Sequence, residues 1–250
     1  GKAIQIHPLV CAAYNADFDG DQMSVYVPLT IEAQLECRMI MMSIYNLFSP
    51  ANGRPLVGPT QDMVMGIYYM TQEKSRERNE GRIFSSIDEA ICAYQHGLVS
   101  LNTKVKICGV TKLTDAEVND ESDVRPPYTT IGRILFLSAI EGSILYDPAK
   151  KKMLPASNIY IPNKALGKRD LVDIIEQIFR KKGLYYTVDM LDKLKQLGYH
   201  YATVSGLTIS VNDMIVPREK KAIIERARKR VEAIEKKAAE GVITESERYN

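Results

Sequence analysis

The first apolar and polar pattern of the chain predicts strands around a short polar segment. Between positions 23 and 27, Met and Val alternate with Ser and Tyr, and a period of two is typical of a half-buried strand. Residues 2–14 are rich in Ile, Val and Ala and are interpreted as strand and loop. We therefore expect residues 15–22 to form a loop between two strands.

Two helices are predicted next, each with apolar residues at helical spacing. Thr30 fits the N-cap of a helix that runs through Met42, and Thr60 fits the N-cap of a second helix after a loop rich in Pro and Gly. The apolar stripes are interpreted as core: Leu35, Met39 and Met42 in the first helix, and Met63, Ile67 and Met70 in the second.

The middle of the chain mixes helices with short strands. Ser86 is predicted to open a helix over residues 88–95 that ends at Gly97. A helix over 168–182 carries one apolar face and ends in Arg and Lys before Gly183, and a further helix is predicted over 188–197, closed by Gly198. In the other segments we expect an exposed connector at 72–82, strands within 99–110 and a surface loop at 111–127. Residues 129–146 are apolar and short-stepped.

The last part of the chain predicts a helix with an unpaired apolar seam. Ile224, Ala227, Val231, Ile234 and Ala238 are spaced three and four apart, which is a heptad seam that usually packs against a partner helix. Nine basic and four acidic residues lie between positions 218 and 237. Since one seam cannot bury itself, we expect the chain to be an internal piece of a longer polypeptide.

The residues after this helix predict the start of a second one. Gly241 is expected to break the first helix. Thr244 and Glu247 form a capping box, so a new helix is predicted from about Glu245.

Composition narrows the class without assigning a function. The chain has 250 residues, a net charge of +2, 45% hydrophobic and 26% charged residues, which is typical of one large or two modest globular domains. Neither an apolar run of about 18 residues nor an export leader is present, so no membrane or secretory role is expected. The near-neutral charge means that contact with nucleic acid must come from local patches.

Cysteine and histidine spacing gives no metal or disulfide framework. Cys11, Cys37, Cys92 and Cys108 lack CxxC spacing and are expected to be free thiols in a reducing compartment. The three histidines, at positions 7, 96 and 200, lie far apart and are interpreted as structural.

Candidate chemistry is concentrated in the segment NADFDGDQM at residues 15–23. Asp17, Asp19 and Asp21 place three carboxylates at alternate positions, and such carboxylates repel one another unless a cation lies between them. Oxygen ligands of this kind suit Mg²⁺, which often bridges to a substrate phosphate. The cluster is thus a candidate for metal-assisted phosphoryl or nucleotidyl transfer.

The cluster has three other possible interpretations. A solvated Asp-rich turn stays open. An EF-hand calcium loop needs Gly at its sixth position and Glu at its twelfth, where this chain has Gln22 and Pro28. A phosphatase of the haloacid-dehalogenase type fits Asp17 to Gly20 as DxDG, but Asp21 stands where that motif has Thr.

The residues around the cluster resemble one family closely. The stretches HPLVCAAY before the cluster, VYVPL after it and LFSPANG further on, with the nine residues of NADFDGDQM unchanged, resemble the largest (β′) subunit of bacterial multisubunit DNA-dependent RNA polymerase. The resemblance continues through GIYYMT, TTIGR, ATVSG and ERYN, the last of which ends the chain at position 250.

This resemblance implies a fold of class α+β with three parts. Residues 1–60 look like part of the catalytic double-psi β-barrel, and residues 61–217 look like the mixed helix and strand pore region at the secondary channel. Residues 218–250 look like the first arm and tip of the rim coiled coil, a helical hairpin.

The resemblance also implies roles for single residues. Asp17, Asp19 and Asp21 match the aspartates that hold one tightly bound Mg²⁺, and a second Mg²⁺ arrives with the nucleoside triphosphate. Asn15 matches a position that contacts the ribose hydroxyl of the nucleotide. Gln61 matches a position near the active centre, although a polar residue at a helix start is an equally simple interpretation. Phe18 is expected to pack into the barrel.

The implied partners are the polymerase β, α and ω subunits, a sigma factor, the DNA template, the RNA transcript and nucleoside triphosphates. Cleavage factors are implied at the rim, and the location is the cytoplasm, at the bacterial nucleoid. The chain alone is expected to be inactive. The alternative function is a non-catalytic docking module for transcription factors that bind the channel.

Overall fold

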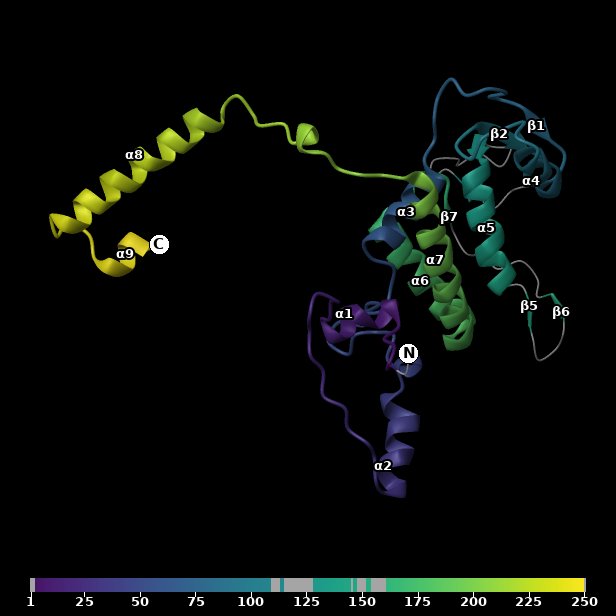
Figure 1. The fold of residues 1–250 in the computed structure, drawn as a ribbon, viewed down its shortest axis with the longest axis horizontal. Coiled ribbons are helices and arrows are strands. Elements are labelled where there is room, and N and C mark those ends of the chain that lie inside the picture. The colour runs from purple at the N-terminus through teal and green to yellow at the C-terminus, as the bar shows by residue number, and fades with distance from the viewer. Residues whose placement is uncertain are drawn as a thin grey trace. The chain divides into compact units, whose positions relative to one another are not determined.

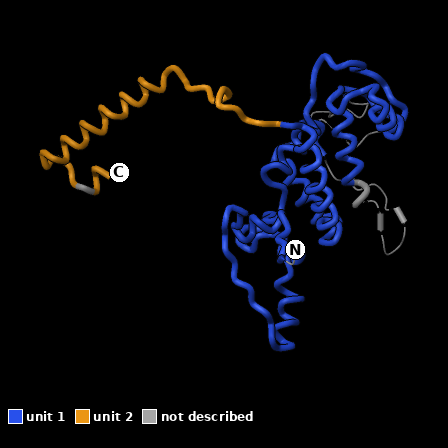
Figure 2. Tube along the Cα trace, in the orientation of Figure 1, with its two compact units in different colours: residues 1–206 blue, residues 207–250 orange. Residues whose placement is uncertain are grey.

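The computed structural model describes the backbone of residues 3–108, 113–114, 128–144, 146–147, 152–153 and 161–249. The chain divides into two compact units, residues 1–206 and residues 207–250 (Figure 2). The fold is a mixed α+β fold with a small sheet, as the sequence predicts. Most of the predicted loop at 111–127 lies outside the described residues.

Helices make up most of the described part of the first unit (Figure 1). The α-helices are α1 (Cys11–Tyr14), α2 (Ile31–Glu36), α3 (Asp62–Thr71), α4 (Ile87–Gln95), α5 (Ile131–Ile144), α6 (Lys168–Lys182) and α7 (Leu184–Ser205). The tighter or wider turns are η1 (Pro8–Val10), η2 (Cys37–Met41) and η3 (Ser43–Tyr45).

Strands are short. They are β1 (Ile83–Phe84), β2 (Lys104–Ile107), β3 (Leu113–Thr114), β4 (Tyr128–Thr130), β5 (Tyr146–Asp147), β6 (Lys152–Met153) and β7 (Ile161–Pro162). β2 lies at the centre of a three-stranded sheet, parallel to β1 and antiparallel to β4. β3 pairs with β7, and β5 pairs with β6.

The main core of the first unit lies where α3, α5 and α6 pack against α7. Met63, Ile67 and Met70 of α3 are buried there, which confirms the predicted apolar face. α3 and α7 cross with almost no space between them, because a Cβ built on Gly66 would lie 1.9 Å from the carbonyl oxygen of Gly198. A second, smaller core fills the space between the three-stranded sheet, α4 and α5.

Several predicted helices are confirmed with their caps. Thr30 Oγ1 accepts a hydrogen bond from Ala33 N–H at the start of α2, and Ser86 caps α4 in the same way. α6 spans the predicted residues, and Gly183 follows it with φ 85°. The helix α5 lies in the apolar segment whose pattern alone indicated no element.

Three predictions about the N-terminal segment are wrong. Residues 8–14 form η1 and α1 instead of strand and loop, because Pro8 starts a helical turn that His7 caps. Residues 23–27 form no strand, and none of the described residues pairs with them in a ladder. The Asp cluster therefore follows a short helix and does not lie between two paired strands.

Three further predictions about helices are also wrong. Leu35, Met39 and Met42 are exposed by 53%, 72% and 45%, so this stripe is not core within the chain. Thr60 does not cap α3, whose N-cap is Gln61. Gly198 lies inside α7 and does not end it, since the close crossing with α3 requires a residue without a side chain there.

The second unit contains η4 (Val211–Asp213), α8 (Lys220–Ala239) and α9 (Glu245–Tyr249). Gly241 follows α8 with φ 71°, and Glu247 accepts hydrogen bonds from the backbone N–H and hydroxyl of Thr244. The helix break and the capping box are thus confirmed. The seam of α8 is exposed, with Ile224 at 41% and Ile234 at 40%.

Candidate functional site

The three aspartates of the cluster converge in the loop after α1. One carboxylate oxygen from each of Asp17, Asp19 and Asp21 lies within 4.8 Å of the others, and all three residues are exposed. The backbone N–H of Asp17 donates a hydrogen bond to Asp21 Oδ2 at 3.1 Å. This bond closes the loop on itself and ties the Asp21 carboxylate to the backbone at Asp17.

The local sequence explains why the chain turns here. α1 ends at Asn15, which has left-handed backbone angles (φ 50°, ψ 42°), a conformation that Asn adopts more readily than most residues. Gly20 has φ 135° and stands between the second and third aspartates. A side chain at that position would strain the backbone, so Gly20 permits the bend that brings the carboxylates together.

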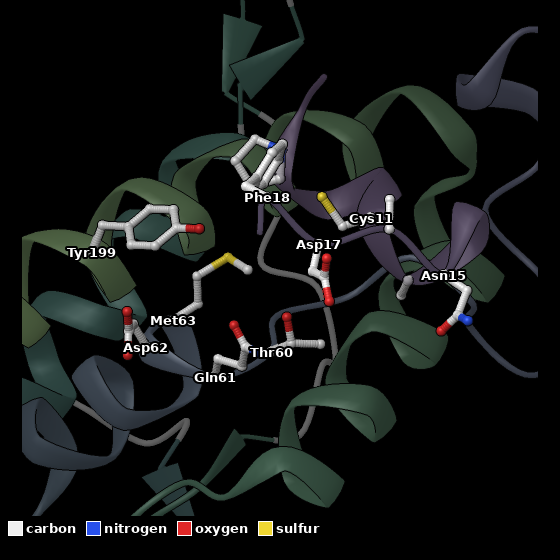
Figure 3. A pocket seen from close by; sticks show the side chains of 12 residues that line it. Cys11, Asn15, Asp17, Phe18, Thr60, Gln61, Asp62, Met63 and Tyr199 are labelled. Carbon is white, nitrogen blue, oxygen red and sulfur yellow. The ribbon is translucent and has the colours of Figure 1, made fainter. Parts of the chain in front are cut away.

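A pocket of about 430 Å³ lies directly beside the cluster (Figure 3). Three segments that are distant in the sequence form its walls: residues 8–18, residues 60–63 and one residue of α7. The polar and aromatic residues that line it are Asn15, Asp17, Phe18, Gln61, Asp62 and Tyr199.

The structure thus brings together three of the five predicted site residues around one pocket. Asn15 and Asp17 line one wall and Gln61 lines another. Asp19 and Asp21 are near Asp17, but they do not line the pocket. The five residues therefore form one continuous site, and their roles stay predictions.

Gln61 has an unusual backbone conformation for a residue with a side chain. Its φ is 46° and its ψ is −119°, and its side chain makes no capping bond to α3. A conformation of this kind costs on the order of 1–3 kcal/mol and is concentrated at functional sites. Gln61 thus stands at the start of α3, as the simpler interpretation has it, but its side chain does not cap that helix.

Phe18 and Tyr199 also line this pocket. Phe18 is predicted to pack into the barrel, and within this chain it is 76% exposed and lines the pocket. Tyr199 of α7 reaches the same pocket from a position more than 180 residues further along the chain. No local pattern marks Tyr199, because only the packing of α7 against α3 brings it there.

The donor set determines what this site can do. Carboxylate oxygens that converge within this distance suit a hard divalent cation such as Mg²⁺, so the residues fit that ion. The amides of Asn15 and Gln61 can donate and accept hydrogen bonds. All four cysteines are free, as predicted, and Cys11 is the one that lines the pocket.

Comparison with known proteins identifies the family. The family model described as RNA polymerase Rpb1, domain 3 matches residues 46–214, and the one described as RNA polymerase Rpb1, domain 2 matches residues 1–43.

Within the parts of the chain that the structure describes, each helix is too short or too polar to span a bilayer.

Curated relatives match over the whole chain. DNA-directed RNA polymerase subunit beta' of Elusimicrobium minutum is 46% identical over 257 residues, and that of Endomicrobium trichonymphae is 41% identical over 272 residues. The subunit of Francisella philomiragia is 43% identical over 250 residues.

These alignments cover 100% of this chain but only 16–17% of each relative. The resemblance seen in the motif and its flanks is therefore confirmed, and it replaces the phosphatase interpretation. With two thirds of its residues matched by the domain 3 model, the chain belongs to the RNA polymerase Rpb1 family and is similar along its full length to an internal part of bacterial β′ subunits.

Proposed function

We propose that this chain supplies the metal-binding carboxylates for DNA-templated nucleotidyl transfer in a DNA-directed RNA polymerase. In that reaction the 3′-hydroxyl of RNA attacks the α-phosphate of a nucleoside triphosphate, and pyrophosphate leaves. The observation that carries the proposal is the convergence of Asp17, Asp19 and Asp21 beside a pocket that Asn15 and Gln61 also line.

Asp17, Asp19 and Asp21 together would hold one Mg²⁺ tightly, and a second Mg²⁺ would enter with the triphosphate. Bound there, the ions supply charge stabilisation for the attacking and leaving oxygens of an in-line displacement. Phosphoryl-type transfer asks little of a protein beyond positioning and electrostatics. The hydrogen bond from Asp17 N–H to Asp21 serves this purpose, because it keeps the Asp21 carboxylate beside the backbone of Asp17 before any ion binds.

The other pocket residues would position the nucleotide. The Asn15 amide can donate to or accept from a ribose 2′-hydroxyl, the group that distinguishes RNA from DNA precursors. Gln61 lines the same pocket from another segment of the chain and would orient the same nucleotide. Its strained backbone is consistent with a side chain held for binding instead of helix capping.

The family supports a larger setting for this site. We propose that residues 1–60 form part of a double-psi β-barrel, that residues 61–217 form the pore region at the secondary channel, and that residues 218–250 begin the rim coiled coil. The exposed, unpaired residues at 23–27 fit a strand that pairs only within a complete barrel. The partners would be the β, α and ω subunits, sigma factor, DNA, RNA and nucleoside triphosphates, in the bacterial cytoplasm.

A second function has its own observation. The seam of α8 is exposed and basic residues surround it, which favours docking of a partner such as a cleavage factor at the rim. Loss of factor binding in a Val231→Asp variant, with normal RNA extension, would support a docking role. It would leave the catalytic role of the aspartates unaffected.

The decisive test is RNA primer extension on a DNA template by a polymerase that contains this segment within a complete β′ subunit. Asp19→Ala should reduce extension by at least about a thousandfold, equivalent to about 4 kcal/mol of transition-state stabilisation. The matched control is Asp88→Ala, which removes an exposed aspartate of α4 outside the pocket. Near-normal extension by Asp19→Ala in an equally assembled complex would contradict the proposal.

A further inference from the structure

A polar cluster joins the segment before the Asp loop to helix α7. His7 Nε2 lies 3.0 Å from Asp192 Oδ1, and Lys195 Nζ donates to the same Asp192 oxygen at 2.9 Å. Lys195 Nζ also lies 2.8 Å from His7 Nε2. The three groups come from two elements that are 185 residues apart in the sequence.

The hydrogen bonds of His7 define where its proton belongs. His7 Nδ1 accepts the backbone N–H of Leu9 at 3.2 Å, which caps the turn η1. An imidazole whose Nδ1 accepts carries its proton on Nε2, so Nε2 donates to Asp192. A nitrogen that carries this proton cannot accept from the Lys195 ammonium, so Lys195 joins the cluster through its hydrogen bond to Asp192. His7 thus uses one ring nitrogen to start the turn and the other to attach that turn to α7.

The segment that His7 attaches to α7 connects directly to the aspartates. η1 continues without a break into α1, which ends at Asn15, and Asp17 follows two residues later. Among the described residues, the hydrogen bond from His7 to Asp192 is the polar side-chain link that joins residues 3–18 to α7. Leu9 is buried in the main core beside it, but an apolar contact does not fix the direction of the turn.

One face of α7 serves both the attachment and the pocket. Asp192, Lys195 and Tyr199 are spaced three and four residues apart, so they lie along the same face of the helix. Asp192 and Lys195 contact His7, and Tyr199 lines the pocket with Asp17 and Phe18. The helical turn of residues 7–14 is therefore held to the same face that forms one wall of the pocket.

The negative charge of Asp192 strengthens the hydrogen bond that attaches His7 to α7. Burial on its own raises the pKa of Asp192, but the hydrogen bonds from Lys195 and His7 outweigh burial and lower the pKa below its ordinary value. Asp192 is therefore an anion near neutral pH and accepts charge-assisted hydrogen bonds, which are stronger than neutral ones.

We propose that His7, held by the Asp192 carboxylate that Lys195 also binds, is a positioning residue that sets how the Asp loop and Asn15 face the nucleotide pocket. It acts through η1 and α1 and touches neither the metal nor the nucleotide. This inference rests on the proposed nucleotidyl-transfer function.

The test uses polymerase assembled with complete β′ and measures RNA extension as a function of Mg²⁺ and of nucleoside triphosphate. His7→Asn keeps an acceptor near the Nδ1 position but is too short for Asp192, whereas His7→Gln keeps a donor near the Nε2 position. Asp192→Ala removes the acceptor, and Asp189→Ala is its control on the same helix, where Asp189 pairs with Lys193.

His7→Asn and Asp192→Ala should each raise the half-saturating Mg²⁺ concentration about fivefold, the order expected for a partly exposed charge-assisted hydrogen bond. His7→Gln and Asp189→Ala should stay near the wild type. The double variant His7→Asn with Asp192→Ala should be no worse than either single variant, because both remove the same contact.

Other results would separate the two proposals. If Asp19→Ala abolishes extension while His7→Asn and Asp192→Ala keep wild-type Mg²⁺ dependence, the positioning role is wrong and the nucleotidyl-transfer function stands. A lower thermal stability of these variants without any change in Mg²⁺ dependence would reduce His7 to a structural residue and overturn the inference. If Asp19→Ala extends RNA normally, both proposals fail.

Discussion

At the scale of single residues, the buried hydroxyl of Tyr201 in α7 makes the free energy of unfolding sensitive to alkaline pH. Its side chain is only 7% exposed, and burial, with a smaller contribution from Tyr94, raises the pKa of its hydroxyl to about 12. The ordinary pKa of Tyr is about 10. The pKa of this hydroxyl is therefore higher in the folded chain than in the unfolded chain. Its contribution to the free energy of unfolding is complete below pH 10 and is lost as the pH rises towards 12.

Tyr201→Phe should therefore make unfolding less sensitive to alkaline pH. Between pH 8 and pH 11 the wild type should lose about 1 kcal/mol more free energy of unfolding than Tyr201→Phe, because one unit of pKa difference is worth about 1.4 kcal/mol. Urea unfolding at the two pH values measures this difference. Tyr185→Phe, which alters a ring that is 75% exposed, should behave like the wild type, and an equal response of both variants would contradict the prediction.

Residue-level chemistry was predictable from the sequence where it is local. Asp17, Asp19 and Asp21 lie within five residues, so their mutual repulsion and their affinity for a cation are visible without a fold. The exposure of Phe18 is not local in this sense, because it depends on what faces the loop. Tyr199 could not be predicted, since its place in the pocket depends on the packing of distant helices.

At the scale of elements, the crossing of α3 and α7 depends on two glycines. A Cβ on Gly66 would lie 1.9 Å from Gly198 O, and one on Gly198 would lie 2.6 Å from Met63 Cα. Both obstacles are backbone atoms, which cannot move aside as a flexible side chain does. The crossing also positions the site, because α3 begins beside Gln61 and α7 carries Tyr199 and Asp192.

Gly66→Ala should separate these helices and destabilise the first unit. Overpacking typically costs about 1–3 kcal/mol, and more where the backbone must shift, so we expect a loss of at least about 3 kcal/mol in urea unfolding. Gly58→Ala is the matched control, because its Cβ would meet Ile175 Cδ1 at an ordinary 3.6 Å. Equal stability of the two variants would show that α3 and α7 have more room than the structure indicates.

Elements with local signals were predicted well, and elements fixed by packing were not. Ser86, Thr30 and the basic end of α6 mark helix ends by hydrogen bonds and charge that the sequence displays directly. α5 was not assigned, because a helix buried on nearly all sides has no amphipathic period. Gly198 is predicted to end a helix, but the same residue type also permits a close helix crossing, which is its role here.

At the scale of the whole molecule, the two units differ in how their apolar residues are covered. The helices of the first unit bury their apolar faces against one another, for example at Ile174 of α6, which is 1% exposed. None of the residues of α8 is buried. The sequence predicted this contrast correctly. The helix at 168–182 has one apolar face, and other helices of the chain can cover it. The last helix has a heptad seam with no partner helix in the chain.

The same substitution in the two units should therefore have very different effects. Ile174→Ala should cost about 2–5 kcal/mol in the free energy of unfolding, because it leaves a cavity in the main core. Ile234→Ala in α8, at a side chain that is 40% exposed, should change stability by less than about 0.5 kcal/mol, since surface substitutions usually do and Ala has the higher helix propensity. Urea unfolding of this chain, followed by circular dichroism at two protein concentrations, measures both. A large loss for Ile234→Ala that grows with protein concentration would mean that copies of the chain cover the seam of α8 in solution.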